Sequence, residues 1–412
     1  MQQLSTLLLQ IVVILITARV VGLLFRRIHQ PQVIGEMVAG ILLGPSLLGW
    51  LAPGVSAWLF PPASLGSLNA LSQIGMVLFM FLVGLEFNPL NIASKKRAAL
   101  VISHASIIAP FLLGSLLSLY LYPRLSDDSV SFTAFALFMG TAMSITAFPV
   151  LARILAERNL TRTPLGALTI SCAAIDDVSA WSILAGVVLL ARSNSTFLSL
   201  LPAFAALAAF ILVMLFAAPR LLRRLELTYR KDGKLSQAAL SIVFLIVMLS
   251  AWVTEQLGVH ALFGAFLAGI VMPKAGDFAR ALTEKLKGVT VVLLLPLFFA
   301  FSGLRTSVGL LRGREMWFYF ALICAAAIAG KFGGATLAAR ATGIPWREAA
   351  AVGVLMNTRG LIELVALNIG LDIHVLSPAL FTVMVLMALV TTLMTSPILH
   401  WLWRPQDQLT GG

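Results

Sequence analysis

Charged residues are scarce in this 412-residue chain, and their scarcity excludes most soluble folds. Only 11% of the residues are Asp, Glu, Lys or Arg, whereas 59% are hydrophobic. An average soluble domain carries about 25% charged residues. The sequence also lacks strands in which polar and apolar residues alternate, and this excludes a membrane β-barrel. The composition therefore predicts an all-α polytopic membrane protein.

Groups that build enzyme active sites are equally rare. The two cysteines, Cys172 and Cys324, lie inside apolar runs, where we expect them to pack rather than to form a disulfide. The five histidines are scattered without metal-ligand spacing. No phosphate-cradling glycine loop or nucleophile elbow occurs. The sequence therefore predicts no enzyme activity, no resident metal and no cofactor.

What the chain does contain is a series of apolar runs, each long enough to predict a membrane span. The thirteen runs lie at about 4–24, 32–48, 65–84, 98–119, 132–152, 165–190, 200–218, 235–257, 261–272, 289–303, 317–339, 349–369 and 378–401. The residues before the first run lack a basic n-region, so we expect this run to be retained rather than cleaved. A single transmembrane domain over 1–412, without a cytosolic regulatory domain, is expected.

Positive charge predicts the orientation in the membrane. With the N-terminus outside, 21 of the 29 Lys and Arg residues fall on the inner side, 5 fall outside and 3 lie within runs. This bias follows the positive-inside rule. It predicts a cytoplasmic C-terminus in the inner membrane. The net charge of +12 thus reflects topology, and no nucleic-acid partner is expected.

The two halves of the chain show weak internal similarity. Gly35–Ile41 matches Gly264–Ile270 at both glycines, one alanine and the isoleucine. We therefore expect two inverted six-helix repeats at about 1–192 and 235–405, joined by a linker helix at about 197–234. Transporters built in this way bind their substrate near the middle of the membrane.

An acidic pair, Asp176 and Asp177, lies about midway along the run 165–190. A charge at such a depth costs about 2.5–3.5 kcal/mol on insertion scales. Two acids at a helix end of a soluble protein would need nearby polar sequence, which is absent. The pair therefore predicts an intramembrane site that binds a cation or a proton.

Polar residues interrupt the run 132–152 as well. Pro149 removes a helix hydrogen bond and clashes with the preceding turn. The hydroxyls of Thr141, Ser144 and Thr146 could satisfy the freed backbone groups or offer oxygens to a cation. A simple kinked helix is the alternative.

A corresponding interruption lies in the run 349–369, at Asn357 and Thr358. Interrupted helices at matching places in two halves are the best sequence indication of a transport site. Arg359 and Glu363 are four residues apart and share a helix face. We favour a buried pair that neutralises itself over a direct role in transport.

Lys331 lies within the run 317–339 and needs a counter-charge at that depth. Adjacent helix residues are about 100° apart, so either Asp176 or Asp177 could pair with Lys331 while the other faces the ion path. The alternative is a lysine that extends to the membrane surface.

Three motifs together resemble the monovalent cation:proton antiporter-2 family: Ala174–Val178 with the acidic pair, Thr141–Leu151, and Asn357–Glu363. The resemblance covers essentially the whole chain and implies the NhaA-like antiporter fold, with thirteen helices, crossed discontinuous helices and a homodimer. It implies that Asp177 carries the cation or the proton in turn. It also implies that Asp176 and Lys331 form a proton-linked ion pair, as in electrogenic members.

The resulting hypothesis is a secondary antiporter that exchanges Na⁺ or K⁺ for H⁺ by alternating access, with net charge movement. A channel-like cation protein and a sodium-coupled solute symporter are the two alternatives. The first would need a continuous polar pore, and the second would need a roomier polar pocket.

Overall fold

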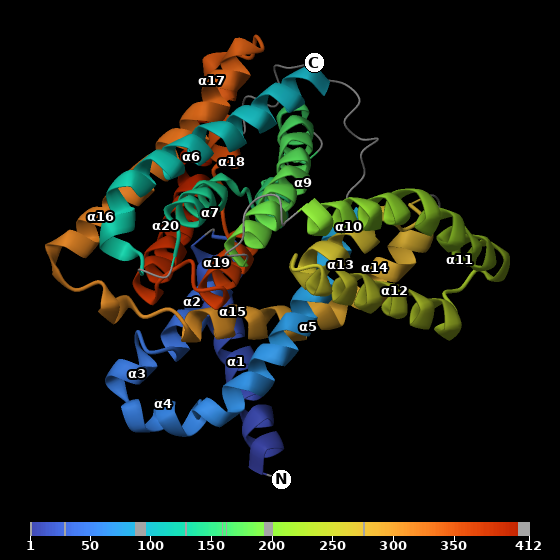
Figure 1. The fold of residues 1–412 in the computed structure, drawn as a ribbon, viewed down its shortest axis with the longest axis horizontal. Helices are drawn as coiled ribbons and strands as arrows, with labels where there is room; N and C mark the ends of the chain where they lie inside the picture. Colours follow the sequence, from blue (N-terminus) through green and yellow to red (C-terminus); the bar gives the residue numbers. More distant parts are fainter. Residues whose placement is uncertain are drawn as a thin grey trace. The chain divides into compact units, whose positions relative to one another are not determined.

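The computed structural model describes residues 2–28, 30–86, 96–127, 130–158, 160–161, 163–192, 201–274 and 277–402. Within these ranges every regular element is a helix (Figure 1). The helices group into two compact units. Unit 1 comprises Met1–Ile16, Ala57–Pro89 and Val188–Phe301, and unit 2 comprises Thr17–Ser56, Leu90–Val187 and Ser302–Gly412.

The helices follow one another along the chain without intervening strands in the described ranges. The first group is α1 Gln2–Arg27, α2 Gln32–Leu43, α3 Leu48–Leu51, α4 Pro53–Leu59, α5 Pro62–Glu86, α6 Lys96–Leu125, α7 Phe132–Ser144, α8 Phe148–Glu157 and α9 Pro164–Arg192. The second group is α10 Leu201–Leu212, η3 Val213–Ala217, α11 Ala218–Asp232, α12 Gln237–Gln256, α13 Ala261–Val271, α14 Phe278–Val289, η4 Thr290–Leu294 and α15 Leu295–Leu304. The last group is η5 Val308–Leu310, α16 Gly313–Ile328, η6 Ala329–Gly333, α17 Gly334–Ala341, α18 Trp346–Met356, α19 Leu361–Asp372 and α20 Pro378–Leu402.

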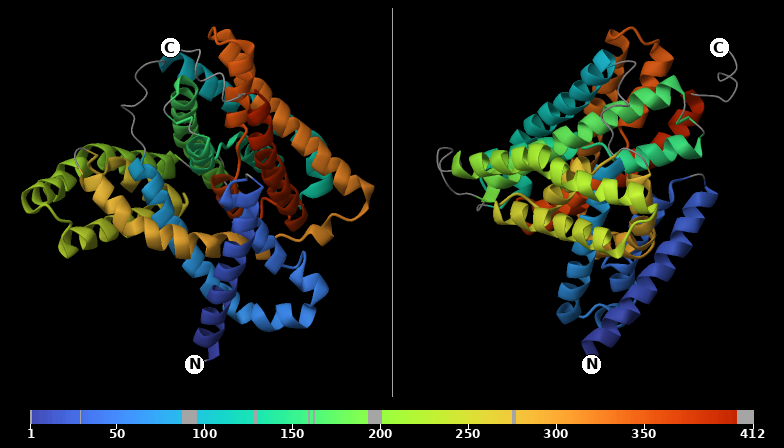
Figure 2. Two further views of the ribbon diagram at one scale, coloured as in Figure 1. Left: turned by 180° about the vertical axis from the view of Figure 1, so that it is seen from behind. Right: turned by 90° about the vertical axis from the view of Figure 1, so that its right-hand side faces the viewer.

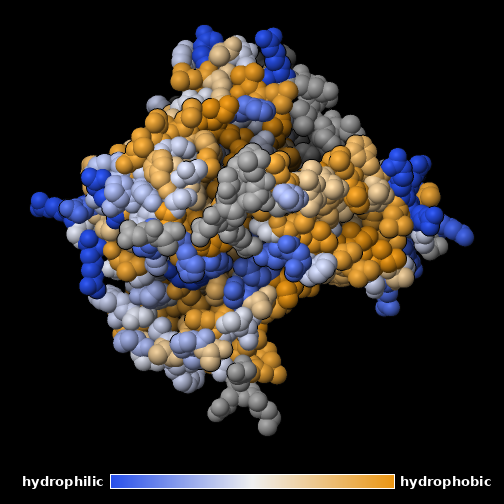
Figure 3. Space-filling model, in the orientation of Figure 1, coloured by the Kyte–Doolittle hydropathy of each residue, from blue (hydrophilic) through white to orange (hydrophobic). Residues whose placement is uncertain are grey.

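Ten helices in the described ranges are long and apolar enough to cross a membrane. Two further apolar helices, α7 and α13, are shorter. Hydrophobic residues cover long stretches of the visible helix surfaces, as a lipid environment requires (Figure 3). The chain is therefore a multi-pass helical membrane protein.

Several boundaries differ from the sequence prediction. Helix α2 ends at Leu43 rather than near 48, since Gly44 adopts an extended backbone. The run predicted at 289–303 belongs to a longer helical stretch that begins at Phe278. The segment predicted as a linker helix is helical from Leu201 to Asp232, while its first residues, 197–200, lie outside the described residues. Gly233, with a φ of 64°, ends α11 in the left-handed region that glycine favours.

Two helices of unit 2 are interrupted. The residues 145–147 separate α7 from α8, and 357–360 separate α18 from α19. The interruptions touch, because the Ala147 amide donates a hydrogen bond of 2.9 Å to the Thr358 carbonyl. Helix α20 packs against α18 and α19 (red and orange in Figure 2). Non-helical backbone from two distant parts of the sequence therefore meets inside unit 2.

Unit 1 is held by the close packing of α5 on α13. A Cβ atom at Gly84 would lie 2.1 Å from the Phe266 carbonyl oxygen, and one at Gly269 would lie 2.2 Å from the Phe81 carbonyl oxygen. Only glycine fits at these two contacts. Small residues of this kind let helices approach closely where lipid supplies no hydrophobic driving force.

Candidate functional site

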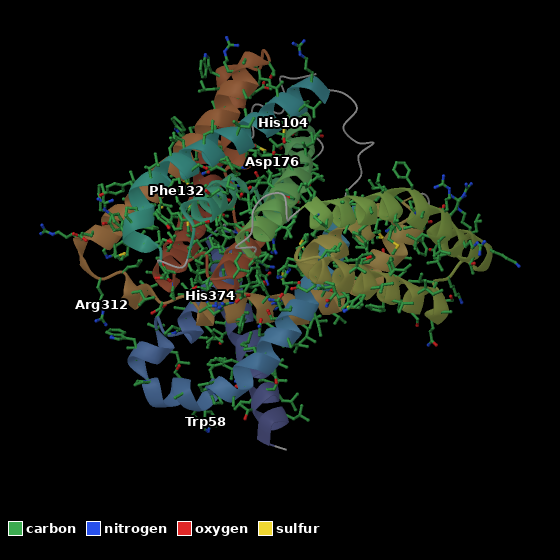
Figure 4. All side chains as sticks on the ribbon, in the orientation of Figure 1. Trp58, His104, Phe132, Asp176, Arg312 and His374 are labelled. Carbon is green, nitrogen blue, oxygen red and sulfur yellow. The ribbon has the colours of Figure 1, made fainter. Side chains whose placement is uncertain are left out.

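The acidic pair lies midway along α9, inside unit 2 (Asp176 is labelled in Figure 4). Asp176 is 0% exposed and Asp177 is 2% exposed. Although adjacent in sequence, the two carboxyl groups have opposite surroundings. The rest of the site is described from this difference between the surroundings of Asp176 and those of Asp177.

Asp176 is surrounded by donors. It accepts hydrogen bonds from the hydroxyls of Ser103 (2.5 Å), Ser106 (2.7 Å) and Thr146 (2.7 Å). The Lys331 ammonium lies 3.1 Å from the same carboxylate. Asp176 is therefore held by three hydroxyl donors and one ammonium group.

Asp177 has a buried oxygen atom, Oδ1, that no donor reaches among the described residues. One helical turn later, the indole Nε1 of Trp181 is likewise buried without a hydrogen-bond partner. A buried carboxyl group without donors favours its neutral, protonated form, whereas a bound cation favours the ionised form. Asp177 therefore presents an open acceptor oxygen in the middle of α9, among the residues that the structure describes.

Lys331 lies in the π-helical segment η6, between α16 and α17. Single π-helical turns often mark functional sites, because they shift a side chain out of the regular helical register. The ammonium also donates to the carbonyl of Ser106 (3.0 Å) and to that of Ser144, at the end of α7. Since Lys331 is 0% exposed, the alternative of a lysine extending to the membrane surface is wrong.

Arg359 caps the interrupted end of α7. Its guanidinium donates to the carbonyls of Ala142 (3.2 Å) and Met143 (2.7 Å). It also pairs with Glu363 at 3.2 Å. The last carbonyls of a helix lack intrahelical partners and carry partial negative charge, so a cation stabilises them. The prediction of a pair that merely neutralises itself was incomplete, because Arg359 and Lys331 together cap the last three residues of α7.

At the interruption between α18 and α19, neutral side chains rather than charged ones contact the backbone carbonyls. The Thr358 hydroxyl donates to the Leu355 carbonyl (2.7 Å), and the Thr146 hydroxyl approaches the Met356 carbonyl (3.3 Å). The Asn357 side-chain oxygen is buried without a hydrogen-bond partner in the described part of the chain. This oxygen is a second acceptor left open near the interrupted backbone.

Other predicted site residues form hydrogen bonds within α7 or with the neighbouring helix. The hydroxyl of Thr141 donates to the Leu137 carbonyl (2.7 Å), one turn back in α7. That of Ser144 is shared between the carbonyls of Gly140 (2.6 Å) and Ile107 (3.1 Å). Their oxygens keep lone pairs for a ligand, but the described hydrogen bonds do not join either residue to Asp177. Pro149 is the second residue of α8, where the missing N–H is tolerated.

Sequence reasoning missed Ser103 and Ser106, which hold Asp176 from α6. Their three-residue spacing inside the apolar run 98–119 places both hydroxyls on one helix face and was the available signal. It also missed Thr392 of α20. This hydroxyl accepts from the Arg359 amide (2.9 Å) and donates to the Arg359 carbonyl (2.8 Å).

Residues 12–404 match the transmembrane sodium/hydrogen exchanger family. The chain belongs to this family. It is 45% identical over 389 residues to the Na⁺/H⁺ antiporter NhaS4 of Synechocystis, and the match covers 94% of this chain and 95% of that relative. It is 41% identical to cation/H⁺ antiporter 18 of Arabidopsis thaliana, over 96% of this chain and 49% of the relative.

A third relative is K⁺/H⁺ antiporter 1 of Saccharomyces cerevisiae, with 34% identity over 96% of this chain and 46% of the relative. The chain thus spans about half the length of these plant and yeast relatives. Among solved structures, the sodium proton antiporter MjNhaP1 from Methanocaldococcus jannaschii superimposes with a TM-score of 0.65. The match covers 99% of both chains at 14% identity, so it establishes a shared fold.

Proposed function

We propose that this family member is a transporter that exchanges Na⁺ or K⁺ for H⁺ across a membrane, with Asp177 as the shared carrier. One observation supports this most strongly. Among the described residues, Oδ1 of Asp177 is buried without a hydrogen-bond partner, while the neighbouring Asp176 accepts from three hydroxyls and pairs with Lys331. The relatives named as Na⁺/H⁺ and K⁺/H⁺ antiporters support the choice of ligands.

The mechanism is competition for one carboxyl group. A proton on Asp177 removes the negative charge that a dehydrated cation needs, and a bound cation disfavours the proton. Each side of the membrane loads the ligand that prevails there, and alternating access exposes the site to one side at a time. The oxygens of Thr141, Ser144 and Asn357 are the candidate additional ligands, since Na⁺ and K⁺ bind oxygen donors.

Net charge movement would come from the Lys331–Asp176 pair. Exchange moves net charge only when the numbers of protons and cations differ. A proton on the Lys331 ammonium is the candidate for the second proton, because its carboxylate partner lies one residue before the carrier. Release of this proton when the cation binds would make each cycle electrogenic.

The proposed architecture is a homodimer of thirteen-helix protomers in the inner membrane, with the N-terminus outside and the C-terminus cytoplasmic. Each protomer would contain inverted repeats at about 1–192 and 235–405, joined by the linker at about 197–234. Support comes from the interrupted helices, one in each half of the chain, which touch through a hydrogen bond from the Ala147 amide to the Thr358 carbonyl.

The direct test is dequenching of a pH-sensitive dye in proteoliposomes after addition of Na⁺, K⁺ or Li⁺. We expect at least one of these ions to drive proton movement in the wild type. Asp177→Asn should lower the rate of this proton movement by about 100-fold or more, because the amide cannot exchange a proton. Ser182→Ala, on the exposed face of the same helix, is the matched control and should exchange normally.

Normal exchange by Asp177→Asn would refute the assignment of the carrier. Ion current that does not require proton movement would indicate a channel. Transport that depends on an organic solute would indicate a symporter.

A further inference from the structure

The Lys331 ammonium offers three N–H donors, and in the described part of unit 2 it contacts three acceptors. One acceptor is the Asp176 carboxylate, at 3.1 Å. The other two are neutral backbone carbonyls, that of Ser106 at 3.0 Å and that of Ser144. A carbonyl inside a regular helix accepts from the amide four residues later. A carbonyl is therefore most open to a lysine where that amide is missing, and both carbonyls meet this condition.

The Ser144 carbonyl is open because α7 ends at this residue. The next residue, Ile145, has an extended backbone with a φ of −67° and a ψ of 133°. The chain thus leaves the helix before an amide can reach back to this carbonyl. The last carbonyls of a helix lack intrahelical partners and carry the negative end of the helix dipole. An ammonium group is a suitable donor for such an oxygen.

The Ser106 carbonyl is open for a different reason, because it lies inside α6. Its helical partner would be the amide of residue 110, four positions later. That residue is Pro110, which lies within α6 and has no backbone N–H. The missing donor is a covalent property of proline and does not depend on any neighbouring side chain. Ser106 also donates its hydroxyl to Asp176 (2.7 Å), so this one residue contacts both members of the buried pair.

The segment that carries Lys331 fits closely against this part of α6. A Cβ atom at Gly330 would lie 2.6 Å from Pro110 Cα and 2.9 Å from Pro110 N, which is closer than packed atoms allow. A Cβ atom at Gly334, one turn later, would lie 2.8 Å from the Ala109 Cβ atom. Small residues let helices approach closely in this way. The approach brings η6 against the turn of α6 in which the carbonyl is open.

We propose that Pro110 is a positioning residue for Lys331. By leaving the Ser106 carbonyl without its helical donor, it creates, together with the Ser144 carbonyl, a neutral ammonium seat formed by α6 and α7. Two of the three contacts then hold the ammonium independently of Asp176, so that the charge-coupling step takes place at one fixed position. This role in transport rests on the proposed function, whereas the placement of the ammonium can be measured without transport.

The first measurement is a double-mutant cycle of unfolding temperatures for the full-length protein in detergent. Pro110→Ala supplies an N–H for the Ser106 carbonyl, and Lys331→Met removes the ammonium that contacts it. Pro110→Ala should therefore raise the unfolding temperature of Lys331→Met by about 2 °C or more beyond its effect on the wild type. The control is Pro123→Ala, an exposed proline near the end of α6. Its cycle with Lys331→Met should be additive, because Pro123 leaves the Leu119 carbonyl open instead.

The second measurement needs no substitution of Lys331. In liposomes, Pro110→Ala should reduce the dependence of the exchange rate on membrane potential about twofold or more, because the new N–H competes for the Ser106 carbonyl. Pro123→Ala should retain the dependence of the wild type. Lactic acid introduced at position 110 has an ester oxygen in place of the N–H, and it should restore the wild-type response without the proline ring.

Additive effects of Pro110→Ala and Lys331→Met would overturn the proposal. Equal dependence on potential in Pro110→Ala and Pro123→Ala would also overturn it, if the wild type shows such a dependence. So would a failure of lactic acid to restore the response, because the bend at proline rather than the missing N–H would then matter. A wild type that exchanges without dependence on potential, or does not exchange, would contradict the proposed function or its charge movement. The stability cycle would still decide how Lys331 is held.

Discussion

Two Arg–Glu pairs with the same spacing lie in different surroundings in the two units. In unit 1, Arg280 and Glu284 on α14 are joined at 3.1 Å, and their side chains are 79% and 68% exposed. In unit 2, Arg359 and Glu363 are joined at 3.2 Å, and both side chains are 0% exposed. The sequence pattern and the distance are nearly identical. Burial, together with the two α7 carbonyls that Arg359 contacts, separates a pair of little energetic consequence from one that the fold depends on.

The same contrast holds for charged residues more broadly. In the described part of unit 1, Glu226 is the charged side chain that is buried, and it is still 9% exposed and paired with Arg230. Unit 2 buries both acids of α9, Lys331 and the Arg359–Glu363 pair almost completely. Buried charge is expensive, so its concentration in unit 2 supports the proposed ion site there.

The largest expected effect is on stability at Arg359. Arg359→Gln should lower the free energy of unfolding by about 3–5 kcal/mol, because it leaves Glu363 buried without its partner and uncaps two carbonyls of α7. The matched variant Arg280→Gln in unit 1 should change it by less than about 0.5 kcal/mol. Thermal unfolding of both variants measures the difference. Equal losses of stability in Arg359→Gln and Arg280→Gln would contradict the claim that the two pairs differ in energetic value.

An intermediate effect is expected for the other buried pair. Lys331→Gln should destabilise the protein by about 3 kcal/mol, somewhat less than the loss of Arg359, because three hydroxyls still donate to Asp176. The double variant Lys331→Gln with Asp176→Asn should recover part of this loss, since no buried charge is then left alone. A double-mutant cycle of unfolding temperatures measures the coupling.

If the effects of Lys331→Gln and Asp176→Asn are simply additive, the two groups do not act as a pair. The electrical readout is separate. In liposomes, the rate of exchange by Lys331→Gln should lose its dependence on membrane potential, and an unchanged dependence would contradict the proposed role in charge movement.

The smallest expected effect concerns a half-buried cation of unit 1. Desolvation lowers the pKa of Lys274 from 10.5 to about 8, and its ammonium donates to the Gly84 carbonyl (3.0 Å). Between about pH 8 and 10.5 the unfolded chain then binds more protons than the folded one, so stability rises with pH in that window. We expect the unfolding temperature to gain about 1–2 °C between about pH 7 and pH 10, relative to Lys274→Met. Parallel pH curves for the two proteins would refute this.

The sequence predicted the membrane class, the family and most helices, because these depend on apolar runs and motifs that are local in the chain. It also indicated that one of two acids could face Lys331, because adjacent residues on a helix point in different directions. Helix periodicity did not indicate which acid, and only the resemblance to the antiporter family implied Asp176. That choice depends on Ser103 and Ser106 of α6, about 70 residues earlier, and on the rotation of α9 against that helix.

The sequence also did not indicate that Arg359 caps the end of α7. Its carbonyl partners at Ala142 and Met143 lie 217 and 216 residues away, and backbone acceptors leave no trace in side-chain identity. The π-helical turn at Lys331 was missed for a related reason, since the glycines around it fit a regular helix equally well. Long-range geometry, rather than composition, decides these features.

The central claim is that Asp177 holds either a proton or a cation, never both. The most direct measurement is proton release from the purified protein in weakly buffered detergent solution when Na⁺ or K⁺ is added. The account predicts saturable release from the wild type and from Ser182→Ala, and no release attributable to this site from Asp177→Asn. Undiminished release from Asp177→Asn, or saturable cation binding to the wild type without any proton release, would contradict it.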